Sequence, residues 1–208
     1  MNTASRTRVS RGDGVALGVI ATGAVSVAVG SAVAIVRGAL DLVGGEPTVP
    51  MPILGGDAPS LEGMPGIESA DYTAADIVFT ALPDGVRWLL FAGGALPALA
   101  TIGVCAVAWW LALSLMRARP FRPAMSAAIG LVACLVIVGG VGGQLVGAIG
   151  RAVLVEQLAA ADAEAKEVFW TFLLDLDLAP VGWGFALALI AGAFTLGARL
   201  QRDSEGLV

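Results

Sequence analysis

Four long segments of the chain contain no charged side chain, and polar segments of unequal length separate them. The uncharged segments are residues 14–36, 88–116, 123–150 and 178–198. Each of them is longer than the ~18 apolar residues that mark a candidate membrane-spanning helix. The pattern predicts an all-α membrane protein, with four transmembrane helices in a single membrane domain over residues 1–208.

The first uncharged segment has two interpretations. It follows basic residues and contains Ala32-Val33-Ala34, a sequence typical of signal-peptide cleavage sites. However, its uncharged run from residue 14 to residue 36 is longer than the ~7–15 residues of a signal-peptide core. We therefore favour an uncleaved anchor.

Charged residues divide by sign between the segments that connect the predicted helices. The N-terminal segment, the connection 117–122 and the C-terminal tail together carry eight basic and three acidic residues. The two long loops, 37–87 and 151–177, carry four basic and fourteen acidic residues. Basic residues near span ends favour the cytoplasm. We therefore expect both termini inside and both loops outside, in the plasma membrane of a bacterium. The preference of the chain for arginine over lysine is typical of a GC-rich genome.

The first predicted outside loop changes character along its length. Its first half is rich in proline and glycine, and residues 48–54 (TVPMPIL) are predicted to form a short extended piece. In the second half, residues 77–79 are apolar anchors, and Ser69 or Asp71 could cap a short helix that ends before Pro83. The acidic residues of the loop lack the spacing of a calcium loop, so we expect a solvated acidic surface.

Other helix boundaries follow from glycine, proline and the apolar pattern. Gly93, Gly94 and Pro97 are expected to kink the second span or to mark an interfacial first turn. The third helix is expected to continue from Arg151 to about Trp170 with an acidic face. Pro180 is expected to start the fourth span, because proline is well tolerated in the first turn of a helix.

Small residues recur at helical spacing in two of the spans. They form one face of a helix in each case, and small faces let helix backbones approach closely in lipid. The predicted packing residues are Gly14, Gly18 and Gly30, with Thr22, Ser26 and Ala34 between and after them, and Gly139, Gly143 and Gly147. The first stripe either packs on a neighbouring span or forms a homodimer seam. Near the second series, Gln144 either hydrogen-bonds across a helix contact or belongs to a permeation path.

The short connection between the second and third spans is basic and contains proline on both sides of Phe121. Its arginines can contact lipid phosphates, and Phe121 can insert at the interface. Docking of a cytoplasmic partner is the alternative role. The predicted lipid- or partner-contact residues are Arg117, Arg119, Phe121 and Arg122.

The layout of the chain and this short connection together resemble a known family. Four spans, a proline-containing first outside loop and Arg119-Pro120-Phe121 are similar to the bacterial membrane proteins of the domain-of-unknown-function 2975 family. Ala118 stands where the element of that family begins with glycine. The resemblance implies a four-helix protein with no established activity. Because family members are suspected of working beside small DNA-binding regulators, it also implies a sensing or modulatory role.

Composition narrows the chemistry that the chain can perform. It has no histidine, which is the commonest metal ligand and acid–base catalyst. Cys105 and Cys134 lie inside apolar segments and are expected to be packing residues. Asp162, Glu164 and Glu167 are the best remaining catalytic candidates, although acids on an exposed helix are usually a solvated face. We therefore expect no catalytic residue, no cofactor and no metal.

The same observations rank the possible functions. The four spans hold no ionisable group, which argues against coupled transport. A net charge of −5 gives no indication of a nucleic-acid partner. We favour a non-enzymatic regulatory or accessory subunit that contacts the lipid bilayer and a membrane-protein partner or a second copy of itself. The alternative is a small homo-oligomeric transporter or channel.

The predicted orientation can be tested by charge reversal. Changing Arg117, Arg119 and Arg122 to glutamate should move the connection out of the cytoplasm in a large fraction of chains, because it removes the basic signal. The measurement is labelling of an Ala118→Cys variant by a membrane-impermeant maleimide in intact cells, with both native cysteines replaced. Lysine at the three positions is the matched control. Unchanged labelling after reversal would contradict the inside assignment of this connection.

Overall fold

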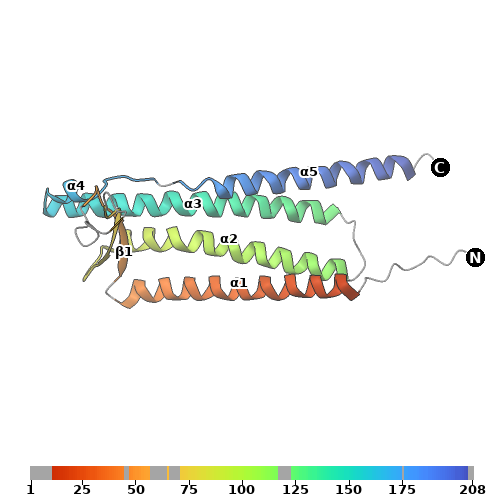
Figure 1. The fold of residues 1–208 in the computed structure, drawn as a ribbon, viewed down its shortest axis with the longest axis horizontal. Coiled ribbons are helices and arrows are strands. Elements are labelled where there is room, and N and C mark those ends of the chain that lie inside the picture. The colour runs from red at the N-terminus through yellow and green to blue at the C-terminus, as the bar shows by residue number, and fades with distance from the viewer. Residues whose placement is uncertain are drawn as a thin grey trace, which may run out of the picture. The chain divides into compact units, whose positions relative to one another are not determined.

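The computed structural model describes residues 11–44, 47–56, 65, 71–116, 123–174 and 176–205. Within these residues the chain is mostly helical, and four helices are long and apolar enough to cross a membrane. They are α1 (Arg11–Gly44), α2 (Asp84–Met116), α3 (Pro123–Ala161) and α5 (Ala179–Glu205), drawn in Figure 1. A single turn, α4 (Ala165–Val168), follows α3.

All four of these helices extend past the uncharged segments that predict them. Helix α2 begins at Asp84 instead of residue 88, and α5 ends at Glu205 instead of residue 198. Helix α1 continues beyond Val36 to Gly44, and proline first occurs in the sequence at Pro47. The predicted extension of α3 beyond Arg151 is confirmed as far as Ala161. The helix does not reach Trp170 as predicted, since only the single turn α4 follows it. Pro180 lies in the first turn of α5, where its missing N–H has no helical acceptor to lose. The helices therefore continue past the charged residues that bound the uncharged segments.

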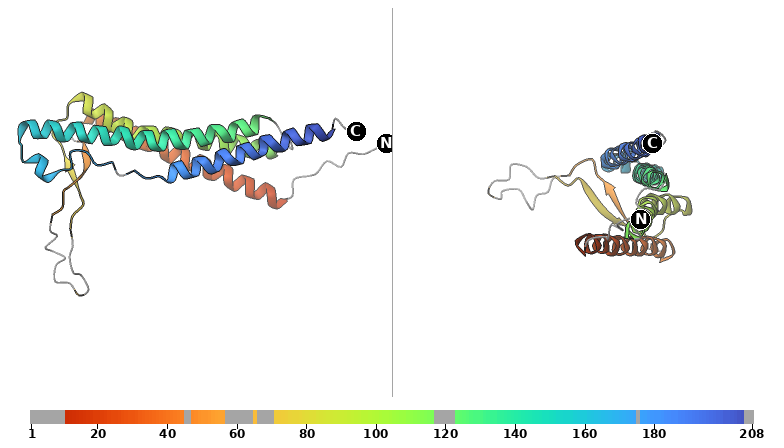
Figure 2. Two further views of the ribbon diagram at one scale, coloured as in Figure 1. Left: turned by 90° about the horizontal axis from the view of Figure 1, so that it is seen from above. Right: turned by 90° about the vertical axis from the view of Figure 1, so that its right-hand side faces the viewer.

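A short antiparallel sheet corrects the all-α prediction. Strand β1 (Thr48–Pro52) confirms the extended piece predicted there, and it pairs with β2 (Ala74–Val78) (Figure 2). In this pairing Met51 lies opposite Ala75. The prediction of a short helix before Pro83 was wrong. Residues along β2 alternate between exposed and half-buried, and β-branched Ile77 and Val78 suit a strand. Ser69, one of the two residues suggested to cap the predicted helix, lies outside the described residues.

Contacts between residues divide the chain into two compact units. Unit 1 comprises Met1–Ile35, Leu96–Gly142 and Asp177–Val208, and unit 2 comprises Val36–Ala95 and Gly143–Leu176. Helices α1, α2 and α3 each contribute residues to both units, whereas the sheet belongs to unit 2.

Unit 1 is held together by small residues at helix contacts. Gly139 of α3 lies against Ala100 and the Leu96 carbonyl oxygen of α2. Gly184 of α5 lies against Ile137 and the Ala133 carbonyl oxygen of α3. A Cβ atom at either glycine would overlap these neighbours, so each contact requires a residue without a side chain.

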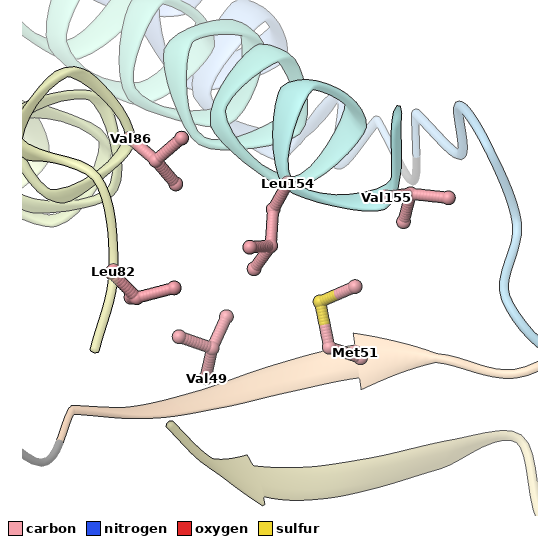
Figure 3. Close-up of a cluster of buried hydrophobic side chains, with 6 residues drawn as sticks. All are labelled: Val49, Met51, Leu82, Val86, Leu154 and Val155. Atoms are coloured by element: carbon pink, nitrogen blue, oxygen red, sulfur yellow. The ribbon is translucent and has the colours of Figure 1, made fainter. Parts of the chain in front are cut away.

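Unit 2 has its own hydrophobic cluster, formed by side chains from two helices, one strand and the segment before α2 (Figure 3). Its buried members are Val49, Met51, Leu82, Val86, Leu154 and Val155. In β1 the buried residues Val49 and Met51 alternate with exposed Thr48 and Pro50, so one face of the strand covers the ends of α2 and α3.

The second edge of β1 is also occupied, at one end. The Leu54 amide donates to the Val168 carbonyl oxygen at 2.9 Å, and the Trp170 amide donates to that of Pro52 at 3.3 Å. Ile53 forms an isolated bridge with Phe169. The segment after α4 therefore pairs with the end of β1 and with the two residues that follow it, so the second edge is covered only at Pro52.

The contact at Gly139 gives a direct test of helix packing in unit 1. Gly139→Leu should lower the free energy of unfolding by about 1–3 kcal/mol, because the new side chain overlaps Ala100 and the α2 backbone. Gly142→Leu is the matched control on the same helix, since no described atom lies within 4 Å of its Cβ position. Thermal unfolding in detergent measures both variants, and equal midpoints would contradict the packing described here.

Candidate functional site

The glycines predicted on the third span lie at contacts with α2. In unit 1, Gly139 meets Ala100. In unit 2, a Cβ atom on Gly93 of α2 would lie 2.7 Å from the Cα atom of Gly147 and 3.3 Å from the carbonyl oxygen of Gly143. The two backbones therefore touch without intervening side chains around Gly93.

The small-residue stripe of α1 has different surroundings. The Cβ positions of Gly18 and Gly30 have no described atom within 4 Å. Thr22 and Ser26 donate their hydroxyl hydrogens to backbone carbonyl oxygens one turn earlier, at 2.9 and 3.1 Å. The surroundings of Gly14 lie outside the described residues, although its backbone belongs to α1.

The basic connection predicted to contact lipid or a partner cannot be placed. Arg117, Arg119, Phe121 and Arg122 lie outside the described residues. Their role stays a prediction.

The acidic candidates lie after the end of α3, and the structure gives one of them, Asp162, a role in a turn. Asp162, Glu164 and Glu167 are exposed, and an Asp162 carboxylate oxygen accepts the Glu164 amide hydrogen at 3.0 Å. Asp177 likewise accepts the Ala179 amide hydrogen at 2.9 Å at the start of α5. Such bonds satisfy amides at turns and helix starts. Among the described residues, no three acidic or cysteine side chains are grouped closely enough to hold a metal ion.

The most developed polar site surrounds Arg87, which in the sequence alone is only one charge of a predicted loop. Arg87 lies in the first turn of α2, and its Nη1 atom donates to the Leu42 carbonyl oxygen at 3.1 Å. Leu42 lies in the last turn of α1, where carbonyl oxygens have no helical donor. The guanidinium thus satisfies the end of one helix from the start of another.

One nitrogen of this guanidinium has no partner. The Nε atom of Arg87 is buried and forms no hydrogen bond in the part of the chain that the structure describes. No described carboxylate forms an ion pair with Arg87 either. A buried donor without an acceptor is unusual in proteins, which makes the surroundings of Arg87 a candidate binding site.

Two cavities of unit 2 adjoin this side chain. The first has a volume of about 150 Å³, and residues on its wall include Gly38, Asp41, Leu42, Thr48, Arg87 and Phe91. The second has a volume of about 350 Å³ and is lined by Ala39, Leu42, Asp84, Arg87, Trp88 and Phe91. Leu42, Arg87 and Phe91 line both cavities. Asp41, Asp84 and Trp88 are exposed, so both cavities are accessible from the surroundings.

The two cavities lie at the ends of apolar helices. Their helical lining residues lie at the end of the candidate span Gly18–Leu42 and at the start of the candidate span Asp84–Ser114. Trp88 packs edge-on against Phe91, with ring centroids 6.0 Å apart. Tryptophan favours the boundary between hydrocarbon and water. The signal available in the sequence was therefore an arginine placed directly before a tryptophan at a span end.

Unit 1 contains an apolar cavity of about 300 Å³ between α2, α3 and the start of α5, with Pro97, Thr101, Gly140 and Pro180 among its lining residues. Its hydroxyl group is already bonded, because Thr101 donates to the Pro97 carbonyl oxygen at 2.8 Å. This cavity offers a surface for hydrocarbon and little chemistry.

No family model, curated protein or solved structure matches the chain. Membership of the four-helix family that the sequence resembles therefore stays a prediction, and the site is interpreted from its own residues.

The bond between Arg87 and α1 predicts a measurable contribution to stability. Arg87→Ala should lower the free energy of unfolding by about 1–3 kcal/mol, because the partly buried Leu42 carbonyl oxygen loses its donor. Arg37→Ala is the control, since Arg37 is an exposed arginine of the same unit, and it should change stability by less than ~0.5 kcal/mol. Thermal unfolding in one detergent compares the two. An equal effect of both substitutions would contradict the assigned role of Arg87.

Proposed function

We propose that this protein is a non-enzymatic regulatory or accessory subunit that acts through protein contacts within a membrane. The membrane is the plasma membrane of a bacterium, and both termini face the cytoplasm. The unequal division of basic and acidic residues supports this orientation. The absence of histidine and of ionisable groups in the predicted spans supports a role without catalysis or coupled transport.

The observation that carries the proposal is the bare surface of α1. In an 18-residue stretch of its candidate span, only 6% of the residues are buried within the chain. The corresponding share is 17% in α2, 17% in α3 and 11% in α5. Val15 and Val19 are 68% and 67% exposed. A helix that packs so little on its own chain offers most of its surface to lipid or to another protein.

The small-residue stripe indicates which of these surfaces is suited to a protein. Gly18 and Gly30 leave open space where a second helix backbone can approach. The hydroxyl groups of Thr22 and Ser26 are already bonded to their own helix, so contact there leaves no polar group without a partner. Close packing of small faces is the main means by which helices associate in lipid.

The family resemblance suggests what kind of partner this contact serves. A sensing or modulatory role beside a regulator agrees with a helix that remains available for a partner, and the basic connection around Arg119 would face the same compartment as a cytoplasmic regulator.

The proposal is tested by isolating the tagged protein from its native membranes in a mild detergent and identifying stoichiometric companions by mass spectrometry. The wild-type chain should retain a partner. A Gly18→Leu/Gly30→Leu variant should lose most of it, because two bulky side chains on the stripe prevent backbone approach. Val19→Leu/Val29→Leu, on exposed positions away from the stripe, is the matched control and should retain the partner.

Two outcomes would contradict the proposal. Purification as a homo-oligomer without a companion would favour the transporter or channel alternative, with flux into liposomes as its readout. A partner retained equally by both double variants would show that α1 does not hold it. Unchanged thermal unfolding of the variants is required for either conclusion.

A further inference from the structure

We propose that the two cavities beside Arg87 bind the headgroup of a phospholipid that carries both a phosphate and a primary ammonium group. Arg87 holds the phosphate, and Asp41 holds the ammonium. This site is independent of the partner contact proposed for α1, since it lies on other residues in unit 2.

The first step of the argument is the unused bonding capacity of Arg87. A guanidinium has five N–H donors, and in the described chain Arg87 uses one of them on the Leu42 carbonyl oxygen. Its buried Nε atom has no partner. The planar fork of donors matches a phosphate group, which can accept two bonds at once. Arg87 is therefore held in place by α1, and the part of its guanidinium that lines the two cavities remains available to a ligand.

The second step concerns the opposite charge across the same space. Asp41 lies on the wall of the smaller cavity, and Asp84 on that of the larger one. Neither forms an ion pair with Arg87 among the described residues, so the charges do not neutralise each other directly. A purely anionic ligand would be repelled by the carboxylates, and a purely cationic ligand by Arg87. A zwitterion satisfies both.

The third step selects a primary amine. Carboxylates such as Asp41 accept hydrogen bonds and have no donor when ionised. A primary ammonium offers three N–H groups to them, whereas a quaternary ammonium such as that of choline offers none. Ethanolamine attached to phosphate therefore fits the pair Arg87 and Asp41 better than phosphocholine does.

The fourth step places the ligand at the surface of a bilayer. Both cavities lie where one candidate span ends and the next begins, beside the exposed Trp88. Lipid phosphates and their counter-charges are found at this level. The smaller cavity, at about 150 Å³, suits a headgroup better than a drug-sized molecule. Leu42, Trp88 and Phe91 in the larger cavity provide apolar surface for the part of the lipid nearest the headgroup.

The test is native mass spectrometry of the delipidated full chain in detergent, titrated with three lipids that have identical acyl chains. Phosphatidylethanolamine should bind more tightly than phosphatidylglycerol and phosphatidylcholine. In Arg87→Gln the affinity for phosphatidylethanolamine should fall by about tenfold or more, as expected for loss of hydrogen bonds to a charged group. Arg37→Gln, an exposed arginine of unit 2 that lines neither cavity, should bind as the wild type does.

Asp41→Asn gives the sharper result, because its two effects have opposite signs. It should weaken the binding of phosphatidylethanolamine, because the ammonium loses its partner. It should strengthen the binding of phosphatidylglycerol, because a repulsive negative charge is removed from the site. Asp41 is exposed and makes no described hydrogen bond, so this variant decides the question even if Arg87→Gln fails to fold.

Several outcomes would overturn the proposal. The first is equal affinity of the wild type for the three lipids. The second is a change of the same sign in the affinities for phosphatidylethanolamine and phosphatidylglycerol in Asp41→Asn. The third is an equal loss of phosphatidylethanolamine affinity in Arg37→Gln and Arg87→Gln. Free phosphoethanolamine is the last arm of the test. We expect it not to displace the lipid at comparable concentration, and displacement would assign the site to a soluble zwitterion in place of a lipid.

Discussion

The close approach of α2 and α3 at Gly93 and Gly147 is the contact on which the rest of unit 2 depends. A Cβ atom on Gly93 would lie 2.7 Å from the Cα atom of Gly147, so the two backbones meet directly. About two turns along each helix, Val86 of α2 and Leu154 of α3 come together and form the base of the buried cluster. Strand β1 adds Val49 and Met51 to that base.

The same contact explains how an arginine can be held at the end of an apolar helix. Arg87 follows Val86 in the sequence, so the turn that buries Val86 in the cluster directs Arg87 to a different face of α2. There it reaches the Leu42 carbonyl oxygen of α1. Packing between helices thus positions a charged group that the local sequence alone would leave in solvent.

The sequence predicts the helices because their signal is local, and it misses the features that depend on distant residues. Uncharged runs longer than a bilayer requires indicate four apolar helices, and the TVPMPIL segment indicates a strand. Strand β2 was mistaken for a helix because the cap-like residues before it and Pro83 after it resemble helix boundaries, and the deciding partner, β1, lies more than twenty residues earlier. The Arg87 site was missed for a similar reason, since Leu42 and Arg87 are 45 residues apart.

The central claim, that the glycine contact between α2 and α3 holds the cluster and its strand in place, is tested most directly by hydrogen–deuterium exchange of the amides of residues 49–54. Gly93→Ala introduces a methyl group against the Gly147 backbone and should speed this exchange. Gly147→Ala places its methyl group no closer than 3.6 Å to any described neighbour and should leave the exchange unchanged. Equal exchange in the two variants would contradict the claim.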